Sequence, residues 1–311
     1  MKVGLLFAGQ GAQHAGMGKD LYQALPRFRE LFDSLAEQVD FDLKALCFEG
    51  PEEQLSQTAY TQPCMVAFAA ALSQVLLEEG VEPVAAAGLS LGEYSALCAS
   101  GVFTPAQAVK LAAFRGQTMT RAAQGLDCGM AAVLGLDREK LAAACAQATQ
   151  GEVVEIANYN CPGQMSIAGT SAAVDRACAL AKEAGARRCV PLKVSGPFHT
   201  SLMAPAGEEL ARRLAGEPLG EMKFPVYFNC LGAPMGDGDT VPALLEKQVQ
   251  SSVYMEDTLR RMAEDGVEAF LEIGPGKVLS GFVKKTVGLP VKSVETLEEL
   301  NQALAWVKGE V

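Results

Sequence analysis

Residues 85–97 of the chain read AAAGLSLGEYSAL, and this stretch decides the fold. The apolar run that starts at Val84 has the length of a buried parallel strand. It breaks at GLSLG, and the residues that follow are typical of a helix. A strand, a sharp turn that carries one serine, and a helix form a nucleophile elbow, whose pattern is G-x-S-x-G. The stretch therefore predicts that Ser90 is held above the edge of a parallel sheet.

The two glycines of this pattern, Gly88 and Gly92, allow the strand and the helix to approach closely, because a Cβ atom there would clash. The backbone N–H of Leu91 falls at the N-terminus of the helix, where negative charge on an oxygen is stabilised. These positions indicate a serine nucleophile with an oxyanion donor beside it. The alternative is an ordinary strand-to-helix turn that carries a small residue.

The composition excludes several classes of protein. The chain has 311 residues and a formal net charge of −11, which argues against non-specific binding to nucleic acids or anionic membranes. It contains nine cysteines, an odd number without a C-x-x-C pair, as expected for buried, reduced thiols in a cytoplasmic protein. The apolar runs are shorter than the ~18 residues of a membrane span. We predict a cytoplasmic protein without a nucleic-acid or membrane partner.

The hydrophobic pattern predicts an α/β protein with a smaller inserted domain. We expect strands at residues 3–7, 84–88, 226–230, 267–273 and 291–294, and helices at residues 20–39, 65–79, 92–100, 105–121 and 202–214. Between residues 130 and 194 the order is strand, helix, strand, strand, helix, strand, which is the ferredoxin-like pattern. The expected domains are residues 1–126 with 197–311, and an insertion at residues 127–196.

One arginine lies on the apolar face of a predicted helix. This helix starts at the cap Thr104 and at Pro105. Arg115 is four residues from both Leu111 and Met119, which belong to the buried stripe. A buried arginine has to be paired or has to face a polar cavity. The pattern favours a functional arginine over the alternative, in which the stem packs and the charged head reaches water.

The chain has only two histidines, His14 and His199. His199 lies in a Gly-Pro loop after the inserted segment, and we predict that it takes the proton of Ser90. An α/β-hydrolase would add a carboxylate between the serine and the histidine in chain order. The candidates in this interval include Asp127, Asp137 and Asp175. They fall in the insertion or at its edge, which argues against a simple esterase.

Several motifs in this order resemble the malonyl-CoA:acyl-carrier-protein transacylases of fatty acid synthesis. The matching stretches are FAGQGAQ at residues 7–13, TQP at 61–63, GLSLGEYSAL at 88–97, RG at 115–116, NYNCPGQ at 158–164, GPFH at 196–199 and GPGKVL at 274–279. The resemblance covers nearly the whole chain, and several independent motifs make it far more specific than the elbow alone.

The resemblance implies a role for each matching residue. Ser90 would be the nucleophile and His199 the base, and the backbone N–H groups of Gln10 and Leu91 would form the oxyanion hole. Arg115 would hold the free carboxylate of the malonyl group through a two-pronged pair. Further substrate-binding residues would be Gln62, Asn160 and Phe198. A backbone carbonyl would orient the histidine, and the matching stretch SSVYM places it on Tyr254.

The same resemblance implies an α/β-hydrolase-like catalytic domain with an inserted ferredoxin-like domain. It implies that the malonyl group passes from malonyl-CoA to the phosphopantetheine thiol of holo acyl carrier protein through a malonyl-serine, in a ping-pong route. No metal and no bound cofactor is expected. The surface that meets the acidic carrier stays open between two basic pairs, Lys284 with Lys285 and Arg187 with Arg188.

Two rival functions remain at this point. The first is an acyl hydrolase or editing acyltransferase of the same fold, which would lose the acyl group to water and show little carboxylate preference. The second is a non-catalytic module that binds the carrier protein through a degenerate site. The intact set of Ser90, His199 and Arg115 argues against the second rival. The pathway served, fatty acid or polyketide synthesis, stays open.

Overall fold

The computed structural model describes residues 1–193 and 195–310. Contacts divide the chain into two compact units, which we describe separately. The first unit is Met1–Gln117, Pro218–Tyr227 and Arg260–Val311, and the second is Thr118–Glu217 and Phe228–Leu259. The second unit contains the predicted insertion and also segments that flank it. The second unit is therefore larger than the predicted insertion at residues 127–196, and the predicted domain boundaries stay a prediction.

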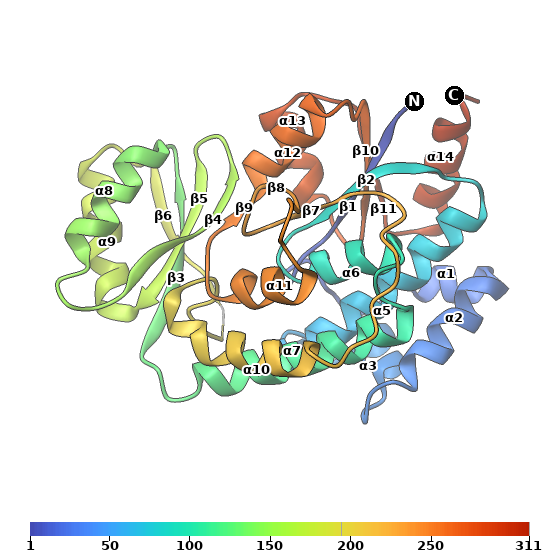
Figure 1. Ribbon diagram of the computed structural model, residues 1–311, viewed down its shortest axis with the longest axis horizontal. Coiled ribbons are helices and arrows are strands. Elements are labelled where there is room, and N and C mark those ends of the chain that lie inside the picture. The colour runs from blue at the N-terminus through green and yellow to red at the C-terminus, as the bar shows by residue number, and fades with distance from the viewer. Residues whose placement is uncertain (194, 311) are drawn as a thin grey trace. The chain divides into compact units, whose positions relative to one another are not determined.

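The first unit is built around a parallel sheet. Its strands are β1 (Val3–Phe7), β2 (Pro83–Gly88), β7 (Val226–Phe228), β10 (Ala269–Ile273) and β11 (Val291–Val294). The order is β11-β10-β1-β2-β7, and the four pairs are parallel (Figure 1). The two-residue strand β8 (Ala233–Pro234) falls in the second unit. Phe7 pairs with both Gly88 and Ile273. The carboxyl ends of three neighbouring strands therefore lie at one edge, where ligands bind in open α/β sheets.

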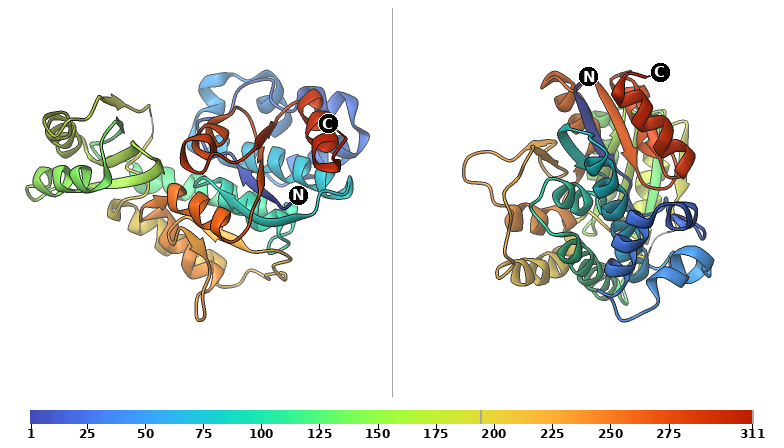
Figure 2. Two further views of the ribbon diagram at one scale, coloured as in Figure 1. Left: turned by 90° about the horizontal axis from the view of Figure 1, so that it is seen from above. Right: turned by 90° about the vertical axis from the view of Figure 1, so that its right-hand side faces the viewer.

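Helices surround this sheet. They are α1 (Lys19–Ala24), α2 (Pro26–Ala36), α3 (Leu43–Glu49), α4 (Glu52–Leu55), α5 (Thr58–Glu78), α6 (Gly92–Ala99), α7 (Pro105–Ala123), α12 (Met255–Glu264), α13 (Val278–Thr286) and α14 (Leu297–Lys308). Of these, α7 and α12 continue into the second unit. The predicted cap of α7 is confirmed, because the Gln107 N–H donates to Thr104 Oγ1 at 3.2 Å. The start of β1 and the end of α14 lie on the same side of the unit (Figure 2).

The second unit contains an antiparallel sheet. Its elements are β3 (Cys128–Leu134), α8 (Arg138–Ala148), β4 (Val154–Cys161), β5 (Gln164–Thr170), α9 (Ser171–Glu183), β6 (Arg188–Pro191), a short 3-10 turn (Ser201–Met203), α10 (Ala204–Leu214), α11 (Val241–Val249) and β9 (Val253–Tyr254). The strand order is β6-β3-β5-β4-β9, and only the β4–β9 pair is parallel. The helices α8 and α9 cover one face of this sheet and share one apolar core with it (Figure 1).

Most predicted elements are confirmed with shifted ends, and the start of α5 is the main correction. The helix was expected at residues 65–79 but begins at Thr58, so Thr61, Gln62 and Pro63 lie inside it. A proline removes one backbone donor and crowds the preceding turn, and here that turn is the first of the helix. The helices α3 and α4 and the strand β9 were not predicted. Residue 194, the predicted end of β6, lies outside the described residues.

Only α5, among the described helices, is long and apolar enough to cross a membrane. In its most apolar window, 83% of the residues are buried inside the fold. The core helix of a folded domain has the same composition, because it is apolar on all sides. Burial therefore explains the composition of α5 without a membrane.

The nine cysteines are free, as predicted, and six of them are buried. Burial raises the pKa of Cys98 and of Cys145 to about 12, so both thiols stay protonated and unreactive. Within residues 1–193 and 195–310, no three side chains of His, Cys, Asp or Glu are placed to hold a metal ion. The expectation of a metal-free site stays a prediction.

His14 links the loop after β1 to the segment after β11. Its Nδ1 donates to the Ala15 carbonyl at 2.9 Å, and its Nε2 bonds to the Glu295 carboxylate. Burial alone would lower the pKa of His14, but these two partners and the Glu52 carboxylate raise it above its ordinary value. Such a histidine stabilises the fold when it is protonated. The contribution is fully present below about pH 6.5 and is lost as the pH rises through the folded pKa.

We therefore expect the free energy of unfolding to lose the His14 contribution between mildly acidic pH, below about 6.5, and alkaline pH, above the raised folded pKa of His14. Urea denaturation at both ends of this range measures the change. His14→Gln should remove this part of the pH dependence, and Glu295→Gln should reduce it because the carboxylate is the charged partner. An equally steep dependence in His14→Gln would assign it to other groups.

Candidate active site

The segment between β2 and α6 forms the predicted elbow. The φ angle of Ser90 is 52°, in the left-handed region that side chains rarely adopt. A Cβ atom on Gly88 would lie 2.0 Å from the carbonyl carbon of Gly92, and one on Gly92 would lie 2.2 Å from the Phe7 carbonyl oxygen. Both glycines are required by close backbone contacts, as the sequence predicts.

The loop after β1 touches the elbow. A Cβ atom on Gly9 would lie 2.6 Å from the carbonyl oxygen of Leu89, which directly precedes the serine. Gln10 is the next residue of this loop. Leu91 is the N-cap residue of α6, so its backbone N–H lies at the positive end of the helix. The loops that carry the two predicted oxyanion donors therefore meet at the carboxyl edge of the sheet.

Arg115 reaches the elbow from α7. Its side chain is 0% exposed, so the alternative in which the head reaches water is wrong. Its Nη2 donates to Ser90 Oγ at 3.1 Å, and its guanidinium carbon lies 5.5 Å from the centre of the Tyr94 ring. Burial lowers the pKa of Arg115, and the nearby Tyr94 and Glu93 oppose this shift. A desolvated cation therefore lies against the predicted nucleophile, where an anionic acyl group would be attracted.

His199 is held by the C-terminus of α11 within the second unit. Its φ angle is 62° and it is 4% exposed. Its Nδ1 donates to the Gln248 carbonyl at 2.8 Å, and its backbone N–H donates to the Val249 carbonyl at 3.2 Å. The last carbonyls of a helix have no partner inside it and carry partial negative charge. The Nδ1 bond orients the ring, and the backbone bond holds the segment that carries it against the end of α11.

The prediction that Tyr254 supplies the orienting carbonyl is wrong, because Gln248 does. Tyr254 lies in β9, which pairs with β4, and its N–H donates to the Asn229 carbonyl at 2.9 Å. Its ring stacks on Tyr159 at 5.1 Å between centres. A backbone carbonyl does bond to the ring, as predicted, but it belongs to Gln248, six residues before Tyr254. A signal in the sequence is the pair Ser251-Ser252, which interrupts the helical pattern after Thr240 and so marks a helix end with available carbonyl groups.

Two of the candidate carboxylates have structural partners. Asp127 accepts a hydrogen bond from the Ser171 hydroxyl at 2.6 Å, and Asp137 caps α8 by accepting from the Lys140 N–H at 2.8 Å. These contacts keep both acids at the ends of helices in the second unit. They support the conclusion that the carbonyl of Gln248, rather than an acid, orients His199.

The remaining predicted substrate-binding residues lie in both units. Gln62 is on α5 of the first unit, 1% exposed, and its Nε2 donates to Gln10 Oε1 at 3.4 Å. Asn160 is partly exposed near the end of β4, where the pairing with β5 is irregular. Phe198 is 7% exposed and directly precedes the histidine. The four basic residues that are candidates for the surface that meets the carrier are all exposed: Lys284, Lys285, Arg187 and Arg188.

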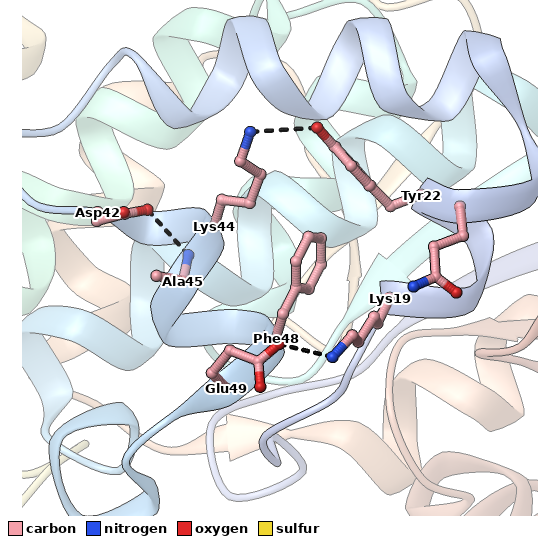
Figure 3. A pocket seen from close by; sticks show the side chains of 8 residues that line it. Lys19, Tyr22, Asp42, Lys44, Ala45, Phe48 and Glu49 are labelled. Carbon is pink, nitrogen blue, oxygen red and sulfur yellow. Dashed lines mark hydrogen bonds and ion pairs between the residues drawn. The ribbon is translucent and has the colours of Figure 1, made fainter.

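A separate pocket of about 410 Å³ opens in the first unit (Figure 3). Tyr22 and Phe48 line it together with Lys19, Lys44 and polar neighbours. Its lysines are already paired, since Lys19 binds Glu49 at 2.6 Å and Lys44 binds Asp33 at 2.8 Å. It contains none of the predicted site residues, so we do not assign the reaction to it.

The fold and the elbow define an α/β enzyme whose predicted serine nucleophile lies beside a buried arginine. A family model described as the acyl transferase domain matches residues 5–304. The chain belongs to this family and is an acyltransferase.

Three relatives are similar over nearly their whole length. The malonyl CoA-acyl carrier protein transacylase of Bacillus subtilis (strain 168) is 41% identical over 308 residues, which is 97% of each chain. An acyl carrier protein S-malonyltransferase from Vibrio cholerae superposes with a TM-score of 0.94 at 41% identity, over 97% of this chain and 100% of its own. A malonyl-transacylase in complex with its type II PKS acyl-carrier protein gives 0.94 at 39%, over 98% and 99%.

Proposed function

We propose that the protein transfers the malonyl group from malonyl-CoA to the phosphopantetheine thiol of acyl carrier protein and so supplies fatty acid elongation. The observation that carries this proposal is the buried guanidinium of Arg115, 3.1 Å from Ser90 Oγ. A malonyl group on the serine would have its free carboxylate within reach of this cation. The relatives named as malonyl transferases, and the one bound to a carrier protein, support the same substrate and partner.

In the first half-reaction, Ser90 Oγ attacks the thioester carbonyl carbon of malonyl-CoA and its proton passes to Nε2 of His199. The backbone N–H groups of Gln10 and Leu91 stabilise the oxyanion that forms. The C–S bond then breaks, the proton moves to the sulfur, and coenzyme A leaves. In the second half-reaction, the carrier thiol gives its proton to Nε2 of the histidine and its sulfur attacks the carbonyl carbon of the malonyl-serine ester. The C–O bond to Ser90 then breaks, and the proton passes from the histidine to Oγ, which restores the serine.

The orientation of His199 supports its role as the base. Its Nδ1 is engaged by the Gln248 carbonyl at 2.8 Å, which selects the tautomer that accepts a proton at Nε2. The negative end of α11 also favours the positive charge that the ring acquires during each half-reaction. The proposal requires this nitrogen to reach Ser90. The neighbouring Phe198 and Asn160, and Gln62 beside Gln10, are proposed to contact the acyl or pantetheine part of the substrate.

We propose an α/β-hydrolase-like catalytic domain at residues 1–126 and 197–311, with a ferredoxin-like domain inserted at 127–196. The order β6-β3-β5-β4 supports the second assignment, because it places the fourth, first, third and second strands of the insertion side by side. We also propose that the enzyme works in the cytoplasm without a metal, a bound cofactor, a membrane or a nucleic acid. The nine free cysteines are consistent with that compartment.

The anchoring role of Arg115 gives a direct test of the substrate. When the protein is mixed with equal concentrations of malonyl-CoA and acetyl-CoA, intact-mass spectrometry should find mainly a malonyl adduct, located on Ser90 by peptide mapping. Arg115→Ala should lower the malonyl-over-acetyl preference by about 10- to 100-fold, because a charge-assisted two-pronged pair contributes about 1.5–3 kcal/mol. Addition of holo carrier protein should remove the adduct and yield malonyl carrier.

Arg115→Lys is the matched control, since it keeps the charge but loses the planar two-pronged geometry, and should retain only part of the preference. Thermal melting of each variant separates folding from selectivity. An unchanged preference in Arg115→Ala would contradict the anchor. Release of coenzyme A without an adduct or a transfer product would favour a hydrolase, and binding of the carrier without either would favour a non-catalytic module.

A further inference from the structure

The side chain of Gln10 is held at both ends of its amide by one face of α5. Its Nε2 donates to Thr58 Oγ1 at 2.9 Å, and its Oε1 accepts from Gln62 Nε2 at 3.4 Å. Thr58 and Gln62 are four residues apart, so they lie one above the other on the helix. They are 1% exposed each. We call this pair, Thr58 and Gln62, the Gln10 clamp.

The backbone on either side of Gln10 is fixed by bonds within the loop and to the sheet. The loop is fixed before it by the bond from the Ala8 N–H to the Ile273 carbonyl at 3.1 Å, and after it by the bond from the Gly11 N–H to Gln13 Oε1 at 2.7 Å. Gly9 and Gly11 flank the residue, and Gly11 has a φ of 104°. Glycines allow many backbone conformations. The two side-chain bonds tie Gln10 itself to the helix α5.

The clamp rests on a fixed part of the fold. Thr58 is the first residue of α5. A Cβ atom added to Gly116 of α7 would lie 2.7 Å from the Thr58 carbonyl oxygen, so the two helices are in close contact at this point. The glycine that follows Arg115 thus allows α7 to press against the start of α5. The Thr58 hydroxyl is therefore carried by a helix end that packs against α7, and it holds the Gln10 side chain from there.

We infer that Thr58 is a positioning residue for the transfer reaction. Its hydroxyl acts through the Gln10 side chain and keeps the Gln10 backbone N–H directed at the oxyanion. The inference rests on the proposed function, because it assigns that N–H to the oxyanion hole. A preorganised donor is effective only while its direction is fixed, and complete loss of one donor lowers the rate by about 10²- to 10³-fold.

Thr58→Val tests the inference, since valine has the same shape but no hydroxyl. We expect the rate constant for Ser90 acylation to fall by about tenfold, a part of the full effect of one donor, with KM within about twofold. The loss should be equal for malonyl-CoA and acetyl-CoA, because every acyl group forms the same oxyanion. Thr58→Ser keeps the hydroxyl and should restore the rate. Rapid-quench kinetics with mass spectrometry measures all three variants.

Thr61→Val is the matched control. Thr61 lies on the same helix and is 0% exposed, but its hydroxyl donates to the backbone carbonyls of Leu55 and Gln57. The control should lose a comparable amount of stability and keep the acylation rate.

Each other outcome overturns the inference. A wild-type rate in Thr58→Val, an equal loss in Thr58→Ser, an equal loss in Thr61→Val, or a changed malonyl-to-acetyl ratio would each do so. Failure of the proposed function looks different, because the wild-type protein itself would then form no malonyl adduct on Ser90.

Discussion

Replacement of Ser90 by alanine should abolish the malonyl adduct and lower transfer to the carrier protein by at least about 10⁴-fold. The hydroxyl oxygen forms the bond to the acyl group, and no other atom of the elbow can replace it. Alanine should be tolerated in the turn, although a φ of 52° is strained for any side chain, because serine already occupies that conformation. Intact-mass spectrometry after incubation with malonyl-CoA measures the adduct directly.

Ser100→Ala is the matched control for this result. Ser100 follows α6, is 0% exposed and donates its hydroxyl to the Leu97 carbonyl at 3.0 Å. The control removes a buried hydroxyl near the same helix and should still form the adduct. A full malonyl adduct on Ser90→Ala would place the nucleophile elsewhere, and peptide mapping would find it.

Replacement of His199 by alanine should lower the acylation rate constant by about 10²- to 10⁴-fold, the usual contribution of a general base. Without the imidazole, the serine proton has to pass to water while the oxyanion donors and Arg115 remain in place. The malonyl preference should therefore survive in the residual activity. Single-turnover kinetics with malonyl-CoA and acetyl-CoA measures both the rate and the preference.

The second histidine of the chain supplies the control. His14→Gln changes a ring whose partners are Ala15 and Glu295, so acylation should stay within about threefold of wild type. Equal losses in the His199 and His14 variants would indicate a general effect on folding. A wild-type rate in His199→Ala would contradict the proposed base.

The elbow could be predicted in detail because local sequence determines it. The apolar strand, the two glycines and the helix after them each restrict the backbone, and the observed close contacts of Gly88 and Gly92 agree with that reasoning. The position of Arg115 could be predicted because helix periodicity places it on the buried stripe. Its distance from Ser90 depends on tertiary packing, so only a family resemblance suggested that the two meet.

The errors have physical causes as well. Pro63 suggested a helix start, but α5 accommodates this proline near its beginning and starts at Thr58. The small helices α3 and α4 were missed because short helices depend on packing more than on their own sequence. The orienting residue was misplaced because its side chain is not the group that binds, and a carbonyl is present at every position of the chain.

The bond between His199 and a main-chain oxygen affects which mutations the enzyme can tolerate during evolution. A triad with an aspartate loses its third member through a single codon change. Here any amino acid at position 248 still presents a carbonyl oxygen, so most point mutations at this position would leave the acceptor of the proposed base in place. Selection would act instead on whatever moves the helix end, such as an insertion or deletion in α11. Chemical synthesis could probe the contact by replacing the peptide bond that follows Gln248 with an ester. This replacement weakens the carbonyl as an acceptor while every side chain stays unchanged.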